Sequence, residues 1–221
     1  MIAFVNGILE MKLNGYIVID VGGVGYKVFM SEIAIESLGN VGDKVKVYTH
    51  HHVREDDISL YGFLTMEELN MFELLLSVSG VGAKSALSIL ANVEPSKFAL
   101  AVITNDTSKL VKIPGVGAKT AARIVLELKD KLKNQNMVAE KESTVKKVLV
   151  DKEELDEAIS ALQVLGYNRK DIEKAFEKID LSNLTLEDMI KQGLKYLSRN
   201  WHVWGWVKNT SIVKGEEYGI W

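Results

Sequence analysis

Residues 78–86 read VSGVGAKSA, and residues 113–121 repeat the pattern as IPGVGAKTA. Every matching position is separated by 35 residues. Each copy follows an apolar stretch of helical periodicity and precedes another, so the repeat predicts two helix–turn–helix units in tandem. Between the helices, Gly-Val-Gly lets the backbone turn sharply and leaves main-chain N–H groups uncovered by side chains.

The pattern favours a phosphate ligand at both turns. The second helix of each unit presents its unpaired N-terminal N–H groups and the positive end of its dipole there. Lys84 and Lys119 fall in the first turn of that helix, where a cation is unfavourable unless an anion is nearby. Two such turns could hold both strands of one duplex across a minor groove without reading bases. The predicted DNA-binding residues are Gly80, Val81, Gly82, Lys84, Ser85, Gly115, Val116, Gly117, Lys119, Thr120 and Arg123.

A single Gly-x-Gly between helices is usually only a tight turn, so the duplication carries the interpretation. A nucleotide-binding P-loop is the obvious alternative. That motif needs glycine directly before the lysine and again five residues earlier. Those positions hold Ala83 and Val78 in the first copy, and Ala118 and Ile113 in the second. The chain is therefore not expected to be an ATPase.

Residues 1–63 are punctuated by glycine and rich in β-branched residues. Asn14-Gly15 and Gly22-Gly23 indicate tight turns between short strands. About five strands with a helical piece near residues 31–38 predict a small β-barrel of the oligonucleotide-binding (OB) type. A small sandwich fits almost as well.

The remaining chain divides by composition. Residues 64–135 carry the two repeats, residues 136–151 are polar and suit a flexible linker, and residues 152–200 contain three short amphipathic segments. These segments, roughly 153–165, 169–179 and 185–198, predict a small three-helix bundle, with Thr185 capping the last helix. The fold class is thus α+β multidomain: an N-terminal OB-fold barrel, a helical domain with two helix-hairpin-helix motifs and a C-terminal three-helix bundle.

Residues 201–221 form an aromatic tail that holds all four tryptophans. The tail is too short and too polar to span a membrane. An interfacial anchor and a plain extension outside the core are both compatible with it. Its role stays open.

Charge is distributed unevenly around a formal net charge of −3. Residues 1–63 carry 5 Lys and Arg against 8 Asp and Glu, residues 64–135 carry 9 against 7, and residues 136–200 carry 11 against 13. Only the block with the repeats is positive, and the local field matters more than net charge for binding a polyanion. The chain has no cysteine, which excludes disulfides and thiolate metal sites. Without a signal peptide or a long apolar run, we expect a cytoplasmic protein that is not in a membrane.

Both repeats resemble the helix-hairpin-helix superfamily, above all the RuvA family of Holliday-junction-binding proteins. The similarity runs to about residue 200 and includes residues 21–26 (VGGVGY), 52–56 (HVRED), 60–63 (LYGF) and 161–167 (ALQVLGY). Two departures stand out. Phe4 and Asn6 occupy positions where the family often has basic residues, and the tail has no counterpart.

The resemblance implies a non-catalytic subunit that holds a four-way DNA junction open and flat in recombination, DNA repair and the SOS response. It implies a homotetramer, which could pair as an octamer, and a mobile third domain that engages the hexameric RuvB-type ATPase. A RuvC-type junction resolvase is a further implied partner. Residues 55–57, Glu-Asp-Asp, read alone as a solvated turn. The resemblance instead places Glu55 and Asp56 on the acidic pin that four subunits bring to the junction centre.

The enzymatic alternative is a base-excision glycosylase, whose family uses a similar hairpin with a catalytic lysine and a downstream aspartate. Lys119 matches that lysine, but only Asp130 follows before the linker, and no second helical half is present to form a base-flipping pocket. We predict no catalytic residue and no cofactor. A helix-hairpin-helix scaffold without junction preference remains open. Residues 50–52, His-His-His, are interpreted as a strand end and not as a metal site, because at most two of the rings could face one ion.

Overall fold

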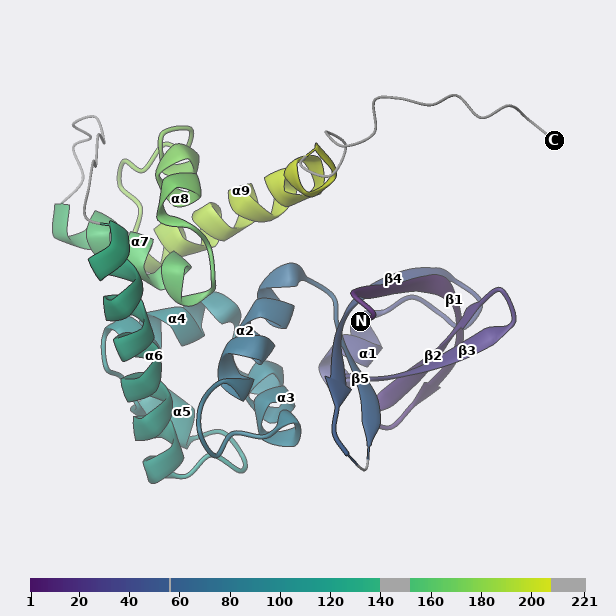
Figure 1. Ribbon diagram of the computed structural model, residues 1–221. Helices are drawn as coiled ribbons and strands as arrows, with labels where there is room; N and C mark the ends of the chain where they lie inside the picture. The colour runs from purple at the N-terminus through teal and green to yellow at the C-terminus, as the bar shows by residue number, and fades with distance from the viewer. Residues whose placement is uncertain (56, 140–151, 208–221) are drawn as a thin grey trace.

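A computed structural model describes residues 1–55, 57–139 and 152–207 (Figure 1). Its N-terminal strands close into a barrel in the order β1-β2-β3-β5-β4. Neighbouring strands are antiparallel except for the parallel pair β3 and β5. The strands are β1 (Phe4–Leu13), β2 (Tyr16–Val21), β3 (Val24–Phe29), β4 (Lys44–Val53) and β5 (Ile58–Phe63). The closed barrel confirms the predicted OB-type architecture over the sandwich.

The alternation of apolar residues along the strands fills the barrel. Leu9, Ile17, Ile19, Val28 and Val47 are fully buried inside it. The predicted turns lie where expected, since the backbone has positive φ at the glycine after β1 and at both glycines between β2 and β3. The short helix α1 (Glu32–Ser37) has a serine N-cap and matches the helical piece predicted at residues 31–38.

The helical part begins at a capping box. The Thr65 side chain accepts a hydrogen bond from the Glu68 N–H, and the Glu68 carboxylate accepts one from the Thr65 N–H. Burial is the largest influence on the Glu68 carboxyl and raises its pKa. The helices that follow are α2 (Met66–Leu76), α3 (Ala83–Asn92), α4 (Pro95–Ile103), α5 (Ser108–Val111) and α6 (Ala118–Ala139). Among the described residues, no single helix is long and apolar enough to cross a membrane, although α3 and α4 pass that test together as a pair bent by 101°.

The third helical group is α7 (Lys152–Val164), α8 (Arg169–Phe176) and α9 (Leu186–Val207). The predicted cap of α9 is confirmed, because the Thr185 hydroxyl accepts a hydrogen bond from the Asp188 N–H at 3.2 Å and donates one to its carboxylate at 2.6 Å. Two predicted ends were too early. Helix α6 continues to Ala139 and α9 to Val207. The predicted ends were too early because they were placed from composition alone, which marked these polar or aromatic stretches as linker and tail. Residues 140–151 of the predicted linker and 208–221 of the tail lie outside the described residues.

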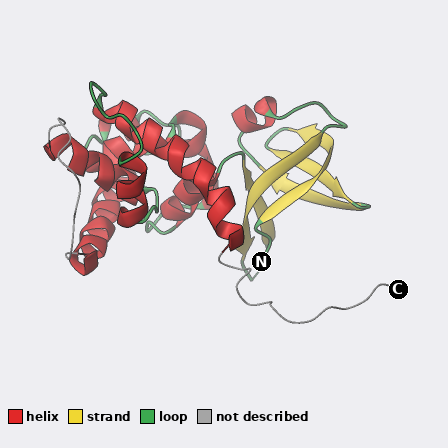
Figure 2. Cartoon of the chain, turned by 90° about the horizontal axis from the view of Figure 1, so that it is seen from above, coloured by secondary structure: helices red, strands yellow, loops and turns green. Residues whose placement is uncertain are grey.

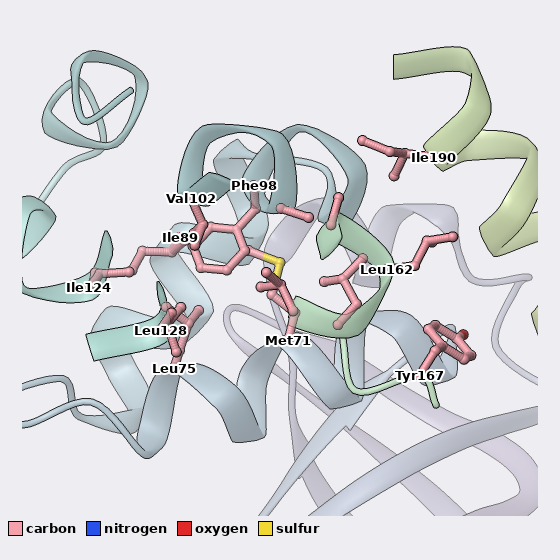
Figure 3. Close-up of a cluster of buried hydrophobic side chains, with 14 of the residues drawn as sticks. Met71, Leu75, Ile89, Phe98, Val102, Ile124, Leu128, Leu162, Tyr167 and Ile190 are labelled. Carbon is pink, nitrogen blue, oxygen red and sulfur yellow. The ribbon is translucent and has the colours of Figure 1, made fainter. Parts of the chain in front are cut away.

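Barrel and helices form two adjacent lobes (Figure 2). The helical lobe has one continuous apolar core, to which the third helical group also contributes. In Figure 3, Met71, Phe98, Leu162 and Tyr167, which come from α2, α4, α7 and the segment after α7, lie in one cluster. Residues 152–198 are therefore packed against the tandem repeat in this structure.

Gly193 in α9 offers a test of this packing. A Cβ built there would lie 2.7 Å from Leu162 Cδ1 and 3.0 Å from Phe176 Cε1, and both neighbours are buried. We expect Gly193→Ala to lower the free energy of unfolding by about 1–3 kcal/mol despite the better helix propensity of alanine. The effect is measured by comparing the thermal unfolding of Gly193→Ala with that of Lys195→Ala, a control substitution at an exposed position of the same helix. If Gly193→Ala is as stable as the control, the core around Gly193 can accommodate a methyl group without strain, and the prediction is wrong.

Candidate nucleic-acid interface

The two Gly-Val-Gly turns have the same backbone conformation. Gly80 and Gly115 both have φ of 83°, a region that favours glycine. The N–H of Val81 donates to the carbonyl three residues earlier at 3.1 Å, and that of Val116 does the same at 3.0 Å. The duplication in sequence is therefore a duplication in structure.

Both turns are anchored from below by apolar side chains. The buried residues form pairs 35 positions apart, each member at most 6% exposed. They are Leu75 and Leu110, Val78 and Ile113, Val81 and Val116, Ala86 and Ala121, and Ile89 and Ile124. The core sides of the two turns are therefore built in the same way, although Ala83 is buried and its counterpart Ala118 is exposed.

The outer surfaces are open and cationic. A Cβ built at Gly82 or Gly117 would meet no atom within 4 Å, so a ligand can approach the backbone closely. Lys84 and Lys119 are exposed in the first turns of α3 and α6. Helix α3 has glycine at its N-cap and no side-chain cap, which suits an external anion at that end. These features are compatible with an anion at both turns, so phosphate binding there stays a prediction.

Helix α6 of the second repeat braces the turn of the first. Arg123 Nη1 donates to the Ser79 carbonyl at 3.2 Å, and the Glu127 carboxylate accepts from the Ser79 N–H at 3.1 Å. One helical turn further, Lys131 Nζ donates to Ser77. These three residues are spaced by four and share one face of α6. Arg123, one of the predicted DNA-binding residues, thus contacts the backbone of the first turn.

A contact in the other direction completes the brace. Ser88 Oγ on α3 donates to the carbonyl of Pro114 in the second turn at 2.9 Å. Each turn is therefore tied to the second helix of the other repeat, which fixes the spacing between the two candidate phosphate sites. Sequence reasoning missed this role for Glu127, Lys131 and Ser88.

The β4–β5 connection carries the acidic residues. The Arg54 N–H donates to the Asp57 carbonyl at 2.8 Å, and Ser59 Oγ donates to the Asp57 carboxylate at 2.6 Å. Glu55 and Asp57 are both exposed, and the Asp57 carboxylate is hydrogen-bonded within the loop. Asp56, the second predicted residue of the acidic pin, lies outside the described residues.

The Arg54 side chain is hydrogen-bonded to a residue of β4. Its Nε donates to His52 Nε2 at 2.9 Å, a bond that requires an unprotonated acceptor nitrogen. Burial, followed by the charge of Arg54, lowers the pKa of His52. Both effects favour a neutral His52 that accepts this hydrogen bond from the guanidinium.

A cluster of aromatic rings around Phe72 packs the barrel against helix α2. His50 Nδ1 lies 3.0 Å from Glu73 Oε1 on α2, and the Phe72 ring centroid is 4.8–5.4 Å from those of His50, Tyr61 and Phe63. Among the described residues, no group of three or more His, Cys, Asp or Glu side chains could hold a metal ion. In Figure 1 both Gly-Val-Gly turns and the β4–β5 connection lie toward the lower edge of the molecule.

A further cation lies on the barrel near Phe4. Lys46 on β4 is opposite Asn6 in register, and its Nζ is 4.6 Å from the Phe4 ring centroid and 4.9 Å from that of Tyr48. The absence of basic residues at positions 4 and 6 therefore does not leave this surface without a positive charge.

Family models match three consecutive segments. Residues 1–62 match the RuvA N terminal domain, residues 72–130 a SAM-like helix-hairpin-helix tandem, and residues 153–198 the RuvA C-terminal domain. The chain is 48% identical over 201 residues to the Holliday junction branch migration complex subunit RuvA of Acetivibrio thermocellus, covering 90% of this chain and 100% of that protein. It is 42% identical over 199 residues to the protein of the same name from Ruminiclostridium cellulolyticum, covering 89% and 100%. The Clostridium perfringens strain SM101 protein of that name is 42% identical over 202 residues, covering 90% and 100%.

Proposed function

The chain belongs to the RuvA family, and from this we propose that it is the subunit of a branch migration complex that binds four-way DNA junctions and holds them open and flat. The observation that carries the proposal is the pair of turns with the same glycine φ and the same backbone hydrogen bond, each with an exposed lysine at a helix start and tied to the other repeat by side chains. Such turns recognise phosphate and not base edges, so binding is independent of sequence.

The proposed assembly is a homotetramer, which can pair as an octamer. Fourfold symmetry in the protein would match four equivalent arms in the DNA. The two turns of each of four subunits would give eight turns for the four arms. Glu55 and Asp56 of every subunit would form the acidic pin at the centre. The division we propose is an OB-fold domain (1–63), a DNA-binding domain (64–135), a linker (136–151) and a motor-binding domain (152–200).

The chemistry of branch migration would come from other proteins. We assign ATP hydrolysis to a separate RuvB-type hexameric motor, recruited and regulated by residues 152–200, and junction cleavage to a RuvC-type resolvase. The P-loop test that both repeats fail supports this division of work.

Binding to a synthetic four-way junction, compared with a linear duplex of the same length, tests the proposal. We expect tighter binding to the junction, a native mass of four or eight chains per junction, and stimulation of a RuvB-type motor's ATPase only when junction DNA is present. Equal affinity for both DNAs would favour the helix-hairpin-helix scaffold without junction preference. Junction binding without motor stimulation would leave the DNA-binding role intact and contradict the coupling role.

A further inference from the structure

Four aromatic side chains form a row across the outer surface of the barrel. The register of the strands places Tyr16 of β2 opposite Phe29 of β3, and Phe29 beside Tyr61 of β5. Tyr61 is in turn opposite His50 of β4. The ring centroids of Tyr16 and Phe29 are 6.0 Å apart, and those of Phe29 and Tyr61 are 5.8 Å apart. All four side chains of this aromatic row are partly exposed.

The inner end of the aromatic row packs against the helices. The Phe72 ring centroid on α2 is 5.3 Å from that of Tyr61 and 5.4 Å from that of His50. Tyr16 and Phe29 continue the row on β2 and β3, the strands that lie farther from the helices in Figure 1. The contact with α2 therefore accounts for the inner end of the row but not for its outer end.

A cation lies over the outer end of the row. Lys27 of β3 is exposed, and its Nζ is 4.3 Å from the Tyr16 ring centroid and 4.8 Å from that of Phe29. A cation–π contact at an exposed site is weak. Lys27 can therefore exchange the rings for a phosphate while it stays beside them. Asp20, an acid on the neighbouring strand, already accepts a hydrogen bond from the Gly23 N–H at 2.7 Å.

A second cation lies on the same side of the row. Strands β3 and β5 are parallel and β4 is antiparallel to β5, so residues before Phe29 and residues after His50 are displaced in the same direction, toward the β4–β5 connection. Lys27 precedes Phe29 by two positions, and Arg54 follows His50 by four. The Arg54 side chain is held there by its hydrogen bond to His52. The surface thus combines a line of rings with cations along one edge.

The complementary polymer has flat apolar groups along one edge and regularly spaced anions along the other. An unpaired DNA strand has this composition, because every base has a π-face that stacks on aromatic side chains and every phosphate carries a charge. The bases of an intact duplex are stacked inside the double helix and cannot reach such a surface.

We propose that the outer end of the aromatic row, Tyr16 and Phe29 with Lys27 beside them, binds single-stranded DNA of any sequence. Bases stack on the two rings, and the phosphates pass along the edge that carries Lys27 and Arg54. Lys27 then contacts a phosphate in place of the rings. This site is separate from the Gly-Val-Gly turns and does not rest on the proposed function.

Fluorescence anisotropy with a labelled oligodeoxythymidylate of about 12 nucleotides, within the ~4–16 that one OB fold covers, measures binding to the full chain. Tyr16→Leu with Phe29→Leu removes both rings and keeps apolar side chains on the strands. We expect its Kd to rise at least about fivefold for each ring that is lost. The control, Tyr16→Phe with Phe29→Tyr, exchanges the two rings and should bind like the wild type. Thermal unfolding of both variants checks that the barrel is intact.

The charge of Lys27 is tested separately. Lys27→Ala should reduce the slope of log K against log salt by about 0.7, the value for one phosphate contact on a single strand. Lys44→Ala removes the same charge from an exposed position on β4, six residues before His50, and should leave the slope unchanged.

Three outcomes would overturn the proposal. The first is a wild-type chain that does not bind the oligonucleotide. The second is a larger loss of oligonucleotide affinity in Lys84→Ala with Lys119→Ala than in the leucine variant, because the Gly-Val-Gly turns would then hold the strand. The third is a leucine variant with a changed native mass and unchanged affinity, because the row would then be a contact between copies of the chain. Junction affinity, measured in parallel, tests the proposed function independently.

Discussion

Replacing Lys84 and Lys119 together with alanine is expected to weaken binding to four-way junctions and to linear duplex alike. Both lysines are exposed at helix starts, beside backbone that a phosphate can approach closely. Each phosphate contact that is lost should reduce the slope of log K against log salt by about 0.9, hence by about 1.8 for the two turns of one subunit. Fluorescence anisotropy at several salt concentrations measures both quantities.

A charge-matched control separates local contact from general electrostatics. Lys170→Ala with Lys174→Ala removes the same charge from exposed positions on α8, away from the turns. We expect a nearly unchanged slope for this control. An unchanged slope in the folded Lys84 and Lys119 double variant would mean that the turns do not bind phosphate, and a loss confined to junctions would mean that they read junction shape.

The features that sequence predicted well are local ones. The barrel turns, the Thr185 cap and the Gly-Val-Gly turns each depend on a few neighbouring residues whose conformational preferences are strong. The duplicated turns were also visible because two copies at a fixed spacing are much more specific than one. Their shared φ at Gly80 and Gly115 follows from that local pattern.

The features that sequence missed join residues far apart in the chain. Arg123 was predicted only as a DNA-binding residue, and its side chain also donates to Ser79, 44 positions earlier. The Tyr167–Glu67 hydrogen bond spans 100 positions. No periodicity reports such pairings, because they depend on how separate helices pack. The spacing of Arg123, Glu127 and Lys131 on one helix face was the one available signal.

Helix ends were the other weak point. Composition placed a linker from residue 136, but residues 118–139 contain neither glycine nor proline, and α6 continues to Ala139. A helical segment that is not packed against a core needs no apolar face. A polar composition is therefore not enough to predict the end of a helix. A terminating residue is the stronger signal.

Neutralising the acidic pin with Glu55→Gln and Asp56→Asn is expected to leave junction affinity unchanged or to raise it, while discrimination against linear duplex falls. Four copies of the pin would bring about eight carboxylates to the centre of the proposed tetramer, facing converging phosphates. Their repulsion would oppose stacking of duplex ends and direct separated strands into neighbouring arms, at a cost in affinity. Junction and duplex affinities and the rate of branch migration are the measurements.

Glu55 is exposed beside two charged residues that have side-chain hydrogen bonds of their own. The Asp57 carboxylate accepts a hydrogen bond from Ser59 Oγ, and Arg54 Nε donates to His52 Nε2 at 2.9 Å. The effect should shrink with added salt, because the Debye length falls from ~10 Å at 0.1 M to ~3 Å at 1 M. Glu10→Gln with Glu36→Gln, which neutralises two exposed acids elsewhere on the barrel, should change neither discrimination nor its salt dependence. If the pin variant instead loses junction affinity while its assembly persists, the carboxylates support the loop or bind a cation, and repulsion is not their role.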